Sequence, residues 1–179
     1  MPEPSNANAL LGCDFDAATA KALNGKNIVA VVTSKDGKKL LAVAGQTGLT
    51  YNISSETSES KTKDDANGGW SLKFHGSKSW DASIDGLYSP DDEALKLIAK
   101  AIDNDEYLCL KIVERTKTPT GVKYVPLRMG RVIITSDKLE APSDDNATYS
   151  LDFEGVGKPW MRETAKPEEI EAATWTVSA

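Results

Sequence analysis

Side chains that build metal centres and disulfide frameworks are scarce in this sequence. It contains one histidine, His75, and two cysteines, Cys13 and Cys109, which stand far apart and form no C-x-x-C pair. A single imidazole forms no histidine cluster around a metal and serves no nucleophile without a further group. We therefore expect free thiols, a solvated His75, no metal site and no cofactor.

Long apolar runs are absent as well. No stretch approaches the roughly 18 to 20 apolar residues that span a bilayer. The start of the chain, MPEPSNANALLG, lacks the basic and apolar regions of a secretory signal. This pattern predicts a soluble protein that is made in the cytoplasm and does not contact a membrane.

Positive charge is in deficit. The 179 residues carry 21 Lys and Arg against 27 Asp and Glu, a formal net charge of −6 at pH 7. Binding to a phosphate backbone depends on cations that release counterions, so this balance argues against a nucleic-acid-binding protein. The hydrophobic fraction of 40% is enough for one core at this length, which favours a single domain.

Recognisable catalytic or nucleotide-binding motifs are also missing. The segment GVGKPW, residues 155–160, lacks the third glycine of a dinucleotide loop and does not open a helix. Asp144, Asn146 and Thr148 alternate as in a calcium loop, but Tyr149 occupies the position that requires glycine. We expect no catalytic residue and no metal ligand.

Strand patterns make up most of the chain. Residues 27–34 are rich in β-branched side chains and lead through Asp36-Gly37, a tight-turn pair, into residues 38–45. Trp70, Leu72 and Phe74 alternate with polar residues and are predicted to face the core, as is Trp80 in the next strand. Further strands are expected over residues 49–54, 80–85, 106–115, 122–136 and 148–155.

One segment is plainly helical. Residues 90–103 follow Ser89 as the expected N-cap, with Pro90 in the first helical position. Apolar residues recur at helical spacing, and Asn104-Asp105 is expected to end the helix. The pattern as a whole predicts a mainly β fold, a β-sandwich or open barrel with one flanking α-helix.

Residues 55–69, SETSESKTKDDANGG, interrupt the strands and contain no large apolar side chain. A segment of this composition cannot bury enough apolar surface to order itself. We expect a long loop that is mobile in the monomer and becomes ordered only on assembly, at an entropic cost.

Five pieces of sequence, taken in order, resemble a known family. They are Trp80, then Asp-Gly-Leu at 85–87, Asp-Glu-Ala at 92–94, GRVIITS at 130–136, and APSDDNATYSLDFEGVG at 141–157. In this order they resemble the major tail proteins of long, flexible-tailed bacteriophages.

The resemblance covers residues 27–157 and implies a tail-tube-like domain there, with the loop 55–69 and the helix 90–103. Residues 1–26 and 158–179 are left as terminal arms. It implies a structural virion protein that forms hexameric rings, which stack into the tail tube, the conduit for DNA ejection. The implied place is the virion tail, with synthesis and assembly in the host bacterial cytoplasm.

The implied partners are further copies of the chain and other tail proteins: terminator, distal tail and tape measure. DNA would pass through the lumen without specific binding. The loop is expected to contact a neighbouring subunit through Glu56, Glu59, Lys61, Lys63, Asp64 and Asp65. Two polar strand faces could line the lumen or form an ordinary outer surface: Thr50, Asn52 and Ser54, and Asp81, Ser83 and Asp85.

Two other functions remain open from the sequence. An acidic β-sandwich could be a binding module for carbohydrate or a surface partner, if Trp70, Trp80, Trp160 and Trp175 formed a stacking platform. A small hydrolase could use a pair of Asp and Glu side chains, although no spacing supports one.

Overall fold

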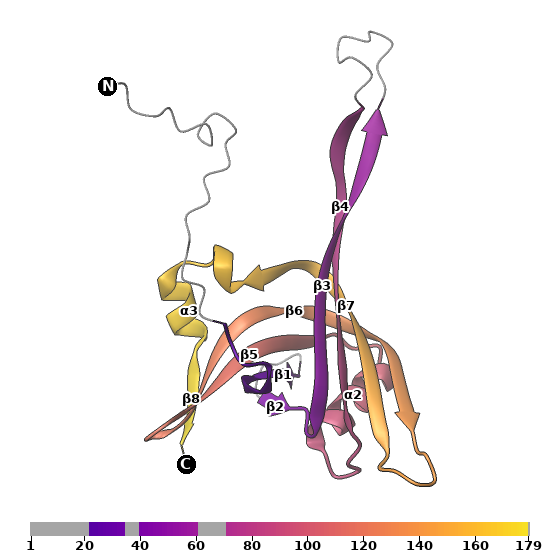
Figure 1. Ribbon diagram of the computed structural model, residues 1–179, viewed down its shortest axis with the longest axis vertical. Helices are drawn as coiled ribbons and strands as arrows, with labels where there is room; N and C mark the ends of the chain where they lie inside the picture. The colour runs from indigo at the N-terminus through magenta and orange to yellow at the C-terminus, as the bar shows by residue number, and fades with distance from the viewer. Residues whose placement is uncertain (1–21, 35–39, 61–70, 179) are drawn as a thin grey trace, which may run out of the picture.

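The computed structural model describes residues 22–34, 40–60 and 71–178, and these form a mainly β structure (Figure 1). The mainly β fold with a helix on its flank that the sequence predicts is confirmed. The elements are η1 (Gly25–Asn27), β1 (Ile28–Thr33), β2 (Leu40–Ala42), β3 (Gln46–Ser60), β4 (Leu72–Leu87), α2 (Glu93–Asp103), β5 (Leu108–Thr118), β6 (Gly121–Glu140), β7 (Thr148–Met161), η2 (Arg162–Thr164), α3 (Pro167–Ala173) and β8 (Trp175–Ser178).

In the described part of the chain, the strands form one antiparallel sheet in the order β2-β1-β5-β6-β7-β4-β3. Strand β8 pairs with β6 beyond the point where β7 leaves it: Met161 of β7 lies opposite Arg128, and Trp175 of β8 lies opposite Tyr124. The chain between them makes η2 and α3. The expected boundary at residue 157 thus falls within β7, and the end of the chain is a strand of the sheet.

The side chain of Gln46 draws the two ends of this sheet together. Its amide accepts a hydrogen bond from the Ala30 N–H at 2.8 Å and donates to the carbonyl oxygens of Ala30 and Val43, each at 2.8 Å. Ala30 lies in β1 and Gln46 begins β3, so one side chain supplies the bonds that a neighbouring strand would make. The sheet is therefore curled around a core.

The core lies inside this curl, and α2 packs against it. Strands contribute the residues of one face of the alternation, as period two requires. Helix α2 adds three small or branched side chains. The core comprises Ala30, Val32, Val43, Trp80, Ala82, Ile84, Ala94, Ile98, Ala101, Leu108, Leu110, Val132, Tyr149, Leu151 and Phe153.

The start of α2 differs from the expectation. The helix begins at Glu93 with Asp92 as its N-cap, so the predicted N-cap Ser89 is wrong. One carboxylate oxygen of Asp92 accepts from the Ala94 N–H and the other from the Ala44 N–H, both at 2.8 Å. This second bond fixes α2 to the turn before β3, which explains why Asp92 is the cap. The helix ends at Asp103 with Asn104 as its C-cap, so Asn104-Asp105 ends it as predicted.

Trp80 is the largest side chain of the core and requires glycine beneath it. It is 4% exposed, and its indole N–H donates to the Gly157 carbonyl at 2.8 Å. A Cβ atom on Gly130 of β6 or on Gly155 of β7 would overlap the indole ring. The two glycines thus make the space that the ring occupies.

The last residues are held by aromatic and ionic contacts. Trp175 of β8 stacks on Tyr124 of β6, with ring centroids 5.3 Å apart and planes 10° apart, and the ammonium group of Lys111 lies over Trp175. Glu163 of η2 forms an ion pair with Arg128 of β6 at 2.5 Å. Among the described residues, no helix combines the length and the apolar character needed to cross a membrane.

Replacing Gly155 by alanine tests the packing of Trp80. We expect Gly155→Ala to lower the free energy of unfolding by about 1–3 kcal/mol, because a well-packed core must shift to admit the extra atom. Urea unfolding monitored by tryptophan fluorescence measures this change. Gly25→Ala is the matched control, because a Cβ atom at Gly25 meets open space. Equal stability of the two variants would contradict the described packing.

Candidate functional site

A polar surface covers the side of β3, β4 and β7 that faces away from the core. The strands are in register, with Thr50 opposite Ser83 and Asn52 opposite Asp81. Asp81 in turn lies opposite Glu154 of β7. We call this surface the polar face. Its residues are Thr50, Asn52, Ser54, Ser79, Asp81, Ser83, Asp85, Ser150, Asp152 and Glu154.

The six candidate residues of the two predicted polar strand faces all belong to this surface. Two cross-strand hydrogen bonds join them to their neighbours: the Asn52 amide donates to the Asp81 carboxylate at 3.0 Å, and the hydroxyls of Ser54 and Ser79 lie 2.7 Å apart. The structure thus places the residues of both predicted faces on one continuous surface.

The sequence analysis missed the acidic residues of β7. Asp152 and Glu154 are exposed on the polar face, beside Ser83 and Asp81 respectively. The alternation of residues 149–154, which puts Leu151 and Phe153 inward, already contained this signal. With them, the polar face carries four carboxylates.

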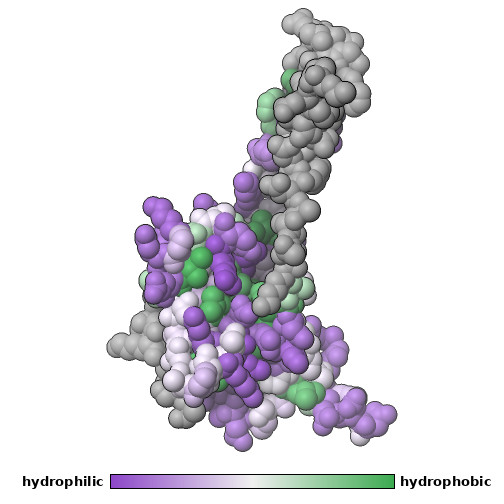
Figure 2. Space-filling view, turned by 60° about the vertical axis from the view of Figure 1, so that its left-hand side comes forward, coloured by the Kyte–Doolittle hydropathy of each residue, from purple (hydrophilic) through white to green (hydrophobic). Residues whose placement is uncertain are grey.

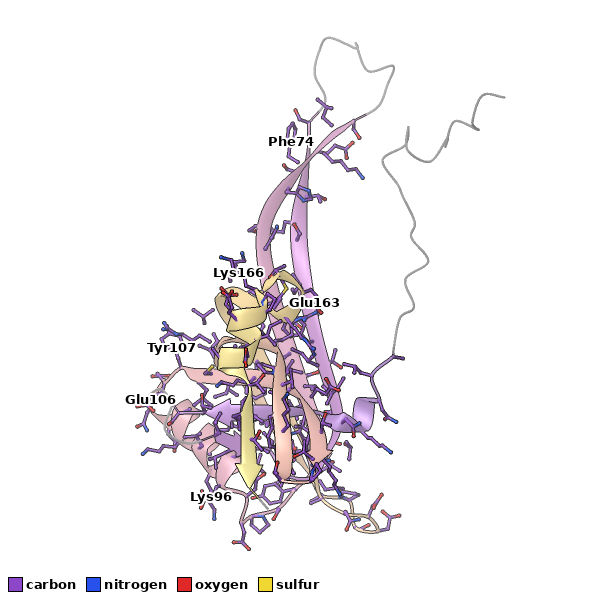
Figure 3. The ribbon with its side chains drawn as sticks, turned by 90° about the vertical axis from the view of Figure 1, so that its left-hand side faces the viewer. Phe74, Lys96, Glu106, Tyr107, Glu163 and Lys166 are labelled. Atoms are coloured by element: carbon purple, nitrogen blue, oxygen red, sulfur yellow. The ribbon has the colours of Figure 1, made fainter. Side chains whose placement is uncertain are left out.

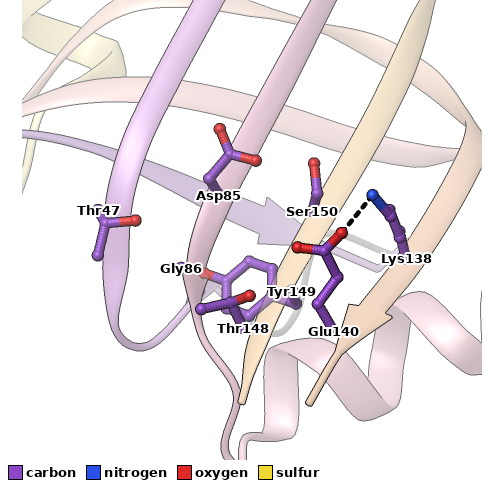
Figure 4. Close-up of a pocket in the computed structure, with 8 residues that line it drawn as sticks. All are labelled: Thr47, Asp85, Gly86, Lys138, Glu140, Thr148, Tyr149 and Ser150. Atoms are coloured by element: carbon purple, nitrogen blue, oxygen red, sulfur yellow. Dashed lines mark ion pairs between the residues drawn. The ribbon is translucent and has the colours of Figure 1, made fainter. Parts of the chain in front are cut away.

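A shallow pocket of about 360 Å³ lies at one end of the polar face (Figure 4). It is lined by Thr47, Asp85, Gly86, Lys138, Glu140, Thr148, Tyr149 and Ser150. Lys138 and Glu140 form an ion pair at 2.5 Å, so the one lysine of the pocket is neutralised by its neighbour. The described residues hold no group of three or more His, Cys, Asp or Glu side chains placed to bind a metal ion.

Tyr149 fastens this end of the polar face to the core. Its hydroxyl donates to the Ala44 carbonyl at 3.0 Å, in the turn that Asp92 also holds. Burial is the main reason that the pKa of the Tyr149 phenol is raised to about 12, and the nearby carboxylates of Asp92 and Asp85 contribute to the same rise. The phenol is therefore a fixed hydrogen-bond donor at neutral pH.

The outer half of the β3–β4 hairpin projects beyond the other strands of the sheet (Figure 1). Strand β4 pairs with β7 only from Asp81 onward, whereas its pairing with β3 continues to Ser60 opposite Leu72. We call residues 54–60 and 72–79 the ribbon. Every residue of the ribbon is exposed.

For residues 55–60 the ribbon corrects the expectation of a loop, and residues 61–69 lie outside the described part of the chain. Glu56 and Glu59 lie on β3, whereas Lys61, Lys63, Asp64 and Asp65 are outside the described residues. Backbone pairing between two strands orders residues that have no core to bury. The low apolar content correctly predicted that these residues are not buried. It did not predict that residues 55–60 form part of a strand.

The prediction that Leu72 and Phe74 face the core is wrong. They are 41% and 54% exposed, because no other strand or helix of the described residues covers the ribbon. Figure 2 shows hydrophilic residues over most of the visible surface and hydrophobic residues near the outer end of the ribbon. Trp70 lies outside the described residues, and the burial of Trp80 removes one member of the proposed stacking platform.

Comparison with protein families decides the identity of the chain. A sequence model described as phage tail tube protein matches residues 22–160. The chain belongs to the phage tail tube protein family. It is a structural component of a phage tail, as the resemblance implied. A comparison with curated protein sequences finds no match.

Solved structures have the same fold. A chain of the virion of a native gene transfer agent particle is similar, with a TM-score of 0.60 and 18% identity, over 78% of this chain and 98% of that one. A chain of the tail of an empty gene transfer agent particle with C6 symmetry has a TM-score of 0.60 and 19% identity, with the same coverage. The SPP1 tail tube protein has a TM-score of 0.59 and 16% identity, over 84% and 86%.

The raised pKa of Tyr149 predicts a pH dependence of stability. Below about pH 10 the phenol is neutral in both states, so its hydrogen bond contributes fully. As the pH rises toward 12, the unfolded chain ionises first, and the free energy of unfolding falls. The contribution is lost by the time the pH passes the folded pKa of about 12.

Urea unfolding of the wild type and of Tyr149→Phe measures this effect. The variant should be less stable by about 1 kcal/mol near neutral pH, the usual contribution of one hydrogen bond. The difference between the two proteins should shrink above about pH 10. A difference that stays constant to about pH 11 would contradict the role of the phenol.

Proposed function

We propose that this tail tube protein forms hexameric rings whose polar faces line a channel, and that stacked rings form the conduit for DNA ejection. The polar face carries this proposal. It has four carboxylates, and the lysine at its end, Lys138, is paired with Glu140. The residues of the polar face include no Lys or Arg that could bind DNA phosphates.

Electrostatics favour the polar face as the wall of a DNA channel. A phosphate backbone gains affinity when Lys or Arg displaces its counterions. Carboxylates repel the same phosphates within a Debye length, about 10 Å at 0.1 M salt. Hydroxyl and amide groups such as those of Ser54 and Asn52 keep the wall hydrated. DNA would therefore pass without specific binding.

Ring formation follows from the free edge of β3. This strand ends the sheet, and its outer edge has no strand partner among the described residues apart from the contacts near Gln46. Open edges invite pairing with other chains, and closing strands into a ring removes them. The C6 symmetry of the gene transfer agent tail supports six copies.

The ribbon is proposed as the contact between rings. It carries Glu56 and Glu59, and the chain beyond it carries Lys61, Lys63, Asp64 and Asp65. An isolated two-stranded hairpin is marginally stable in water. Contact with a neighbouring copy would stabilise it, which couples ribbon order to assembly.

The remaining expectations are proposals on the same basis. The protein would act without catalysis, with terminator, distal tail and tape measure proteins as further partners. Synthesis and assembly would take place in the host bacterial cytoplasm. Residues 1–26 would be an arm beside the tube domain, whereas residues 158–161 and 175–178 belong to its sheet as part of β7 and as β8.

Electron microscopy of the purified protein at rising concentration tests the proposal. We expect rings, and then tubes, with six copies per ring and Asp81, Asp152 and Glu154 turned toward the channel. Dispersed monomers at every concentration would contradict assembly. Tubes whose polar face points outward would contradict the channel assignment alone.

A further inference from the structure

Phe74 is the most exposed aromatic side chain of the ribbon. It is 54% exposed and lies opposite Ser58, and Leu72, opposite Ser60, is exposed beside it on the same face. A phenylalanine buries 150–250 Å² when it is fully packed, about the largest gain any side chain offers. Exposed apolar side chains near the end of a projecting ribbon therefore indicate that they are buried against another protein surface.

A hollow of about 160 Å³ lies at the other end of the molecule, between α2 and β6. Two large side chains at its mouth are exposed, Tyr88 by 42% and Leu139 by 55%. Figure 3 shows Phe74 at the tip of the ribbon and Lys96, which lines the hollow, at the opposite end. The hollow is lined by Tyr88, Ser89, Pro90, Leu95, Lys96, Ala99, Asp137, Leu139 and Tyr149.

We propose that this hollow receives Phe74 from a copy in the adjoining ring. The proposal rests on the proposed function and names the surface that the ribbon contacts. The ribbon and the hollow lie at opposite ends of one molecule (Figure 3), so one copy cannot join them itself. When the ribbon of one copy enters the hollow of another, the pair still has a free ribbon at one end and a free hollow at the other. Such a head-to-tail contact can be repeated to give an open stack of copies.

The size of the hollow suits one phenyl ring. An apolar cavity of about 150 Å³ holds a benzene molecule, and this hollow has about 160 Å³. Its walls, Leu95, Ala99 and Leu139, are apolar, as a phenyl ring requires.

Three variants test the contact. Phe74→Ala removes the inserted ring, and Ala99→Trp fills the hollow from an exposed position of α2. Lys100→Trp is the matched control, because it adds the same side chain to the next, exposed position of the helix, which does not line the hollow. The concentration at which tubes appear is measured by sedimentation and electron microscopy, and thermal unfolding checks that each variant is folded.

We expect Phe74→Ala and Ala99→Trp to raise the tube-forming concentration at least tenfold while single rings persist. Lys100→Trp should assemble like the wild type. The double variant Phe74→Ala with Ala99→Trp should assemble as well as whichever single variant assembles less readily, because both changes remove the same contact. If Ala99→Trp unfolds, Leu139→Ser serves in its place.

The outcomes separate this proposal from the proposed function. Wild-type tubes together with an unchanged threshold for Ala99→Trp would overturn the hollow as the acceptor and leave the tube intact. Additive losses in the double variant would show two separate contacts and overturn the pairing of Phe74 with the hollow. Failure of the wild type to form rings or tubes would overturn the proposed function itself.

Discussion

The unpaired backbone at the β3 end of the sheet is the constraint on which the rest of this structure depends. Within the described part of the chain, strand β3 pairs with β4 only, and beyond Asp81 the ribbon has no third strand. In most proteins such an edge is a hazard that short strands or covering elements suppress. Here β3 is 15 residues long and its outer half is fully exposed. In the tube proposed above, neighbouring copies would cover this edge.

The rest of the molecule holds that edge in place. Gln46 bonds the start of β3 to β1, and Asp92 and Tyr149 bond the preceding turn at Ala44 to the helix and to β7. Trp80 fills the space that two glycines leave at the root of the ribbon. These contacts position the polar face and the ribbon relative to one another within a single copy. The packed core thus ends where the ribbon begins, and every described residue of the ribbon is exposed.

Much of this could be predicted from the sequence, and the failures share one cause. Period-two alternation located the strands and put Thr50, Asn52 and Asp81 on exposed positions and Ser83 on the same outward face, because side-chain direction is a local property. The same alternation assigned Phe74 to one face of its strand. It could not show that no second layer of described structure packs against that face. The choice of Asp92 as N-cap depends on its bond to Ala44, and the pairing of β8 with β6 depends on contacts across the sheet. Burial, capping and edge pairing are set by distant parts of the chain, which local patterns do not encode.

Amide hydrogen exchange in the ribbon tests the central claim most directly, with monomeric protein compared with assembled tubes. Amides of residues 54–60 and 72–79 should exchange rapidly in the monomer, because a two-stranded ribbon without a core opens easily. In tubes the same amides should be protected at least tenfold, while those of buried β5 change little. Equal exchange of the ribbon in both states would contradict the account, because neighbouring copies would then leave the ribbon uncovered.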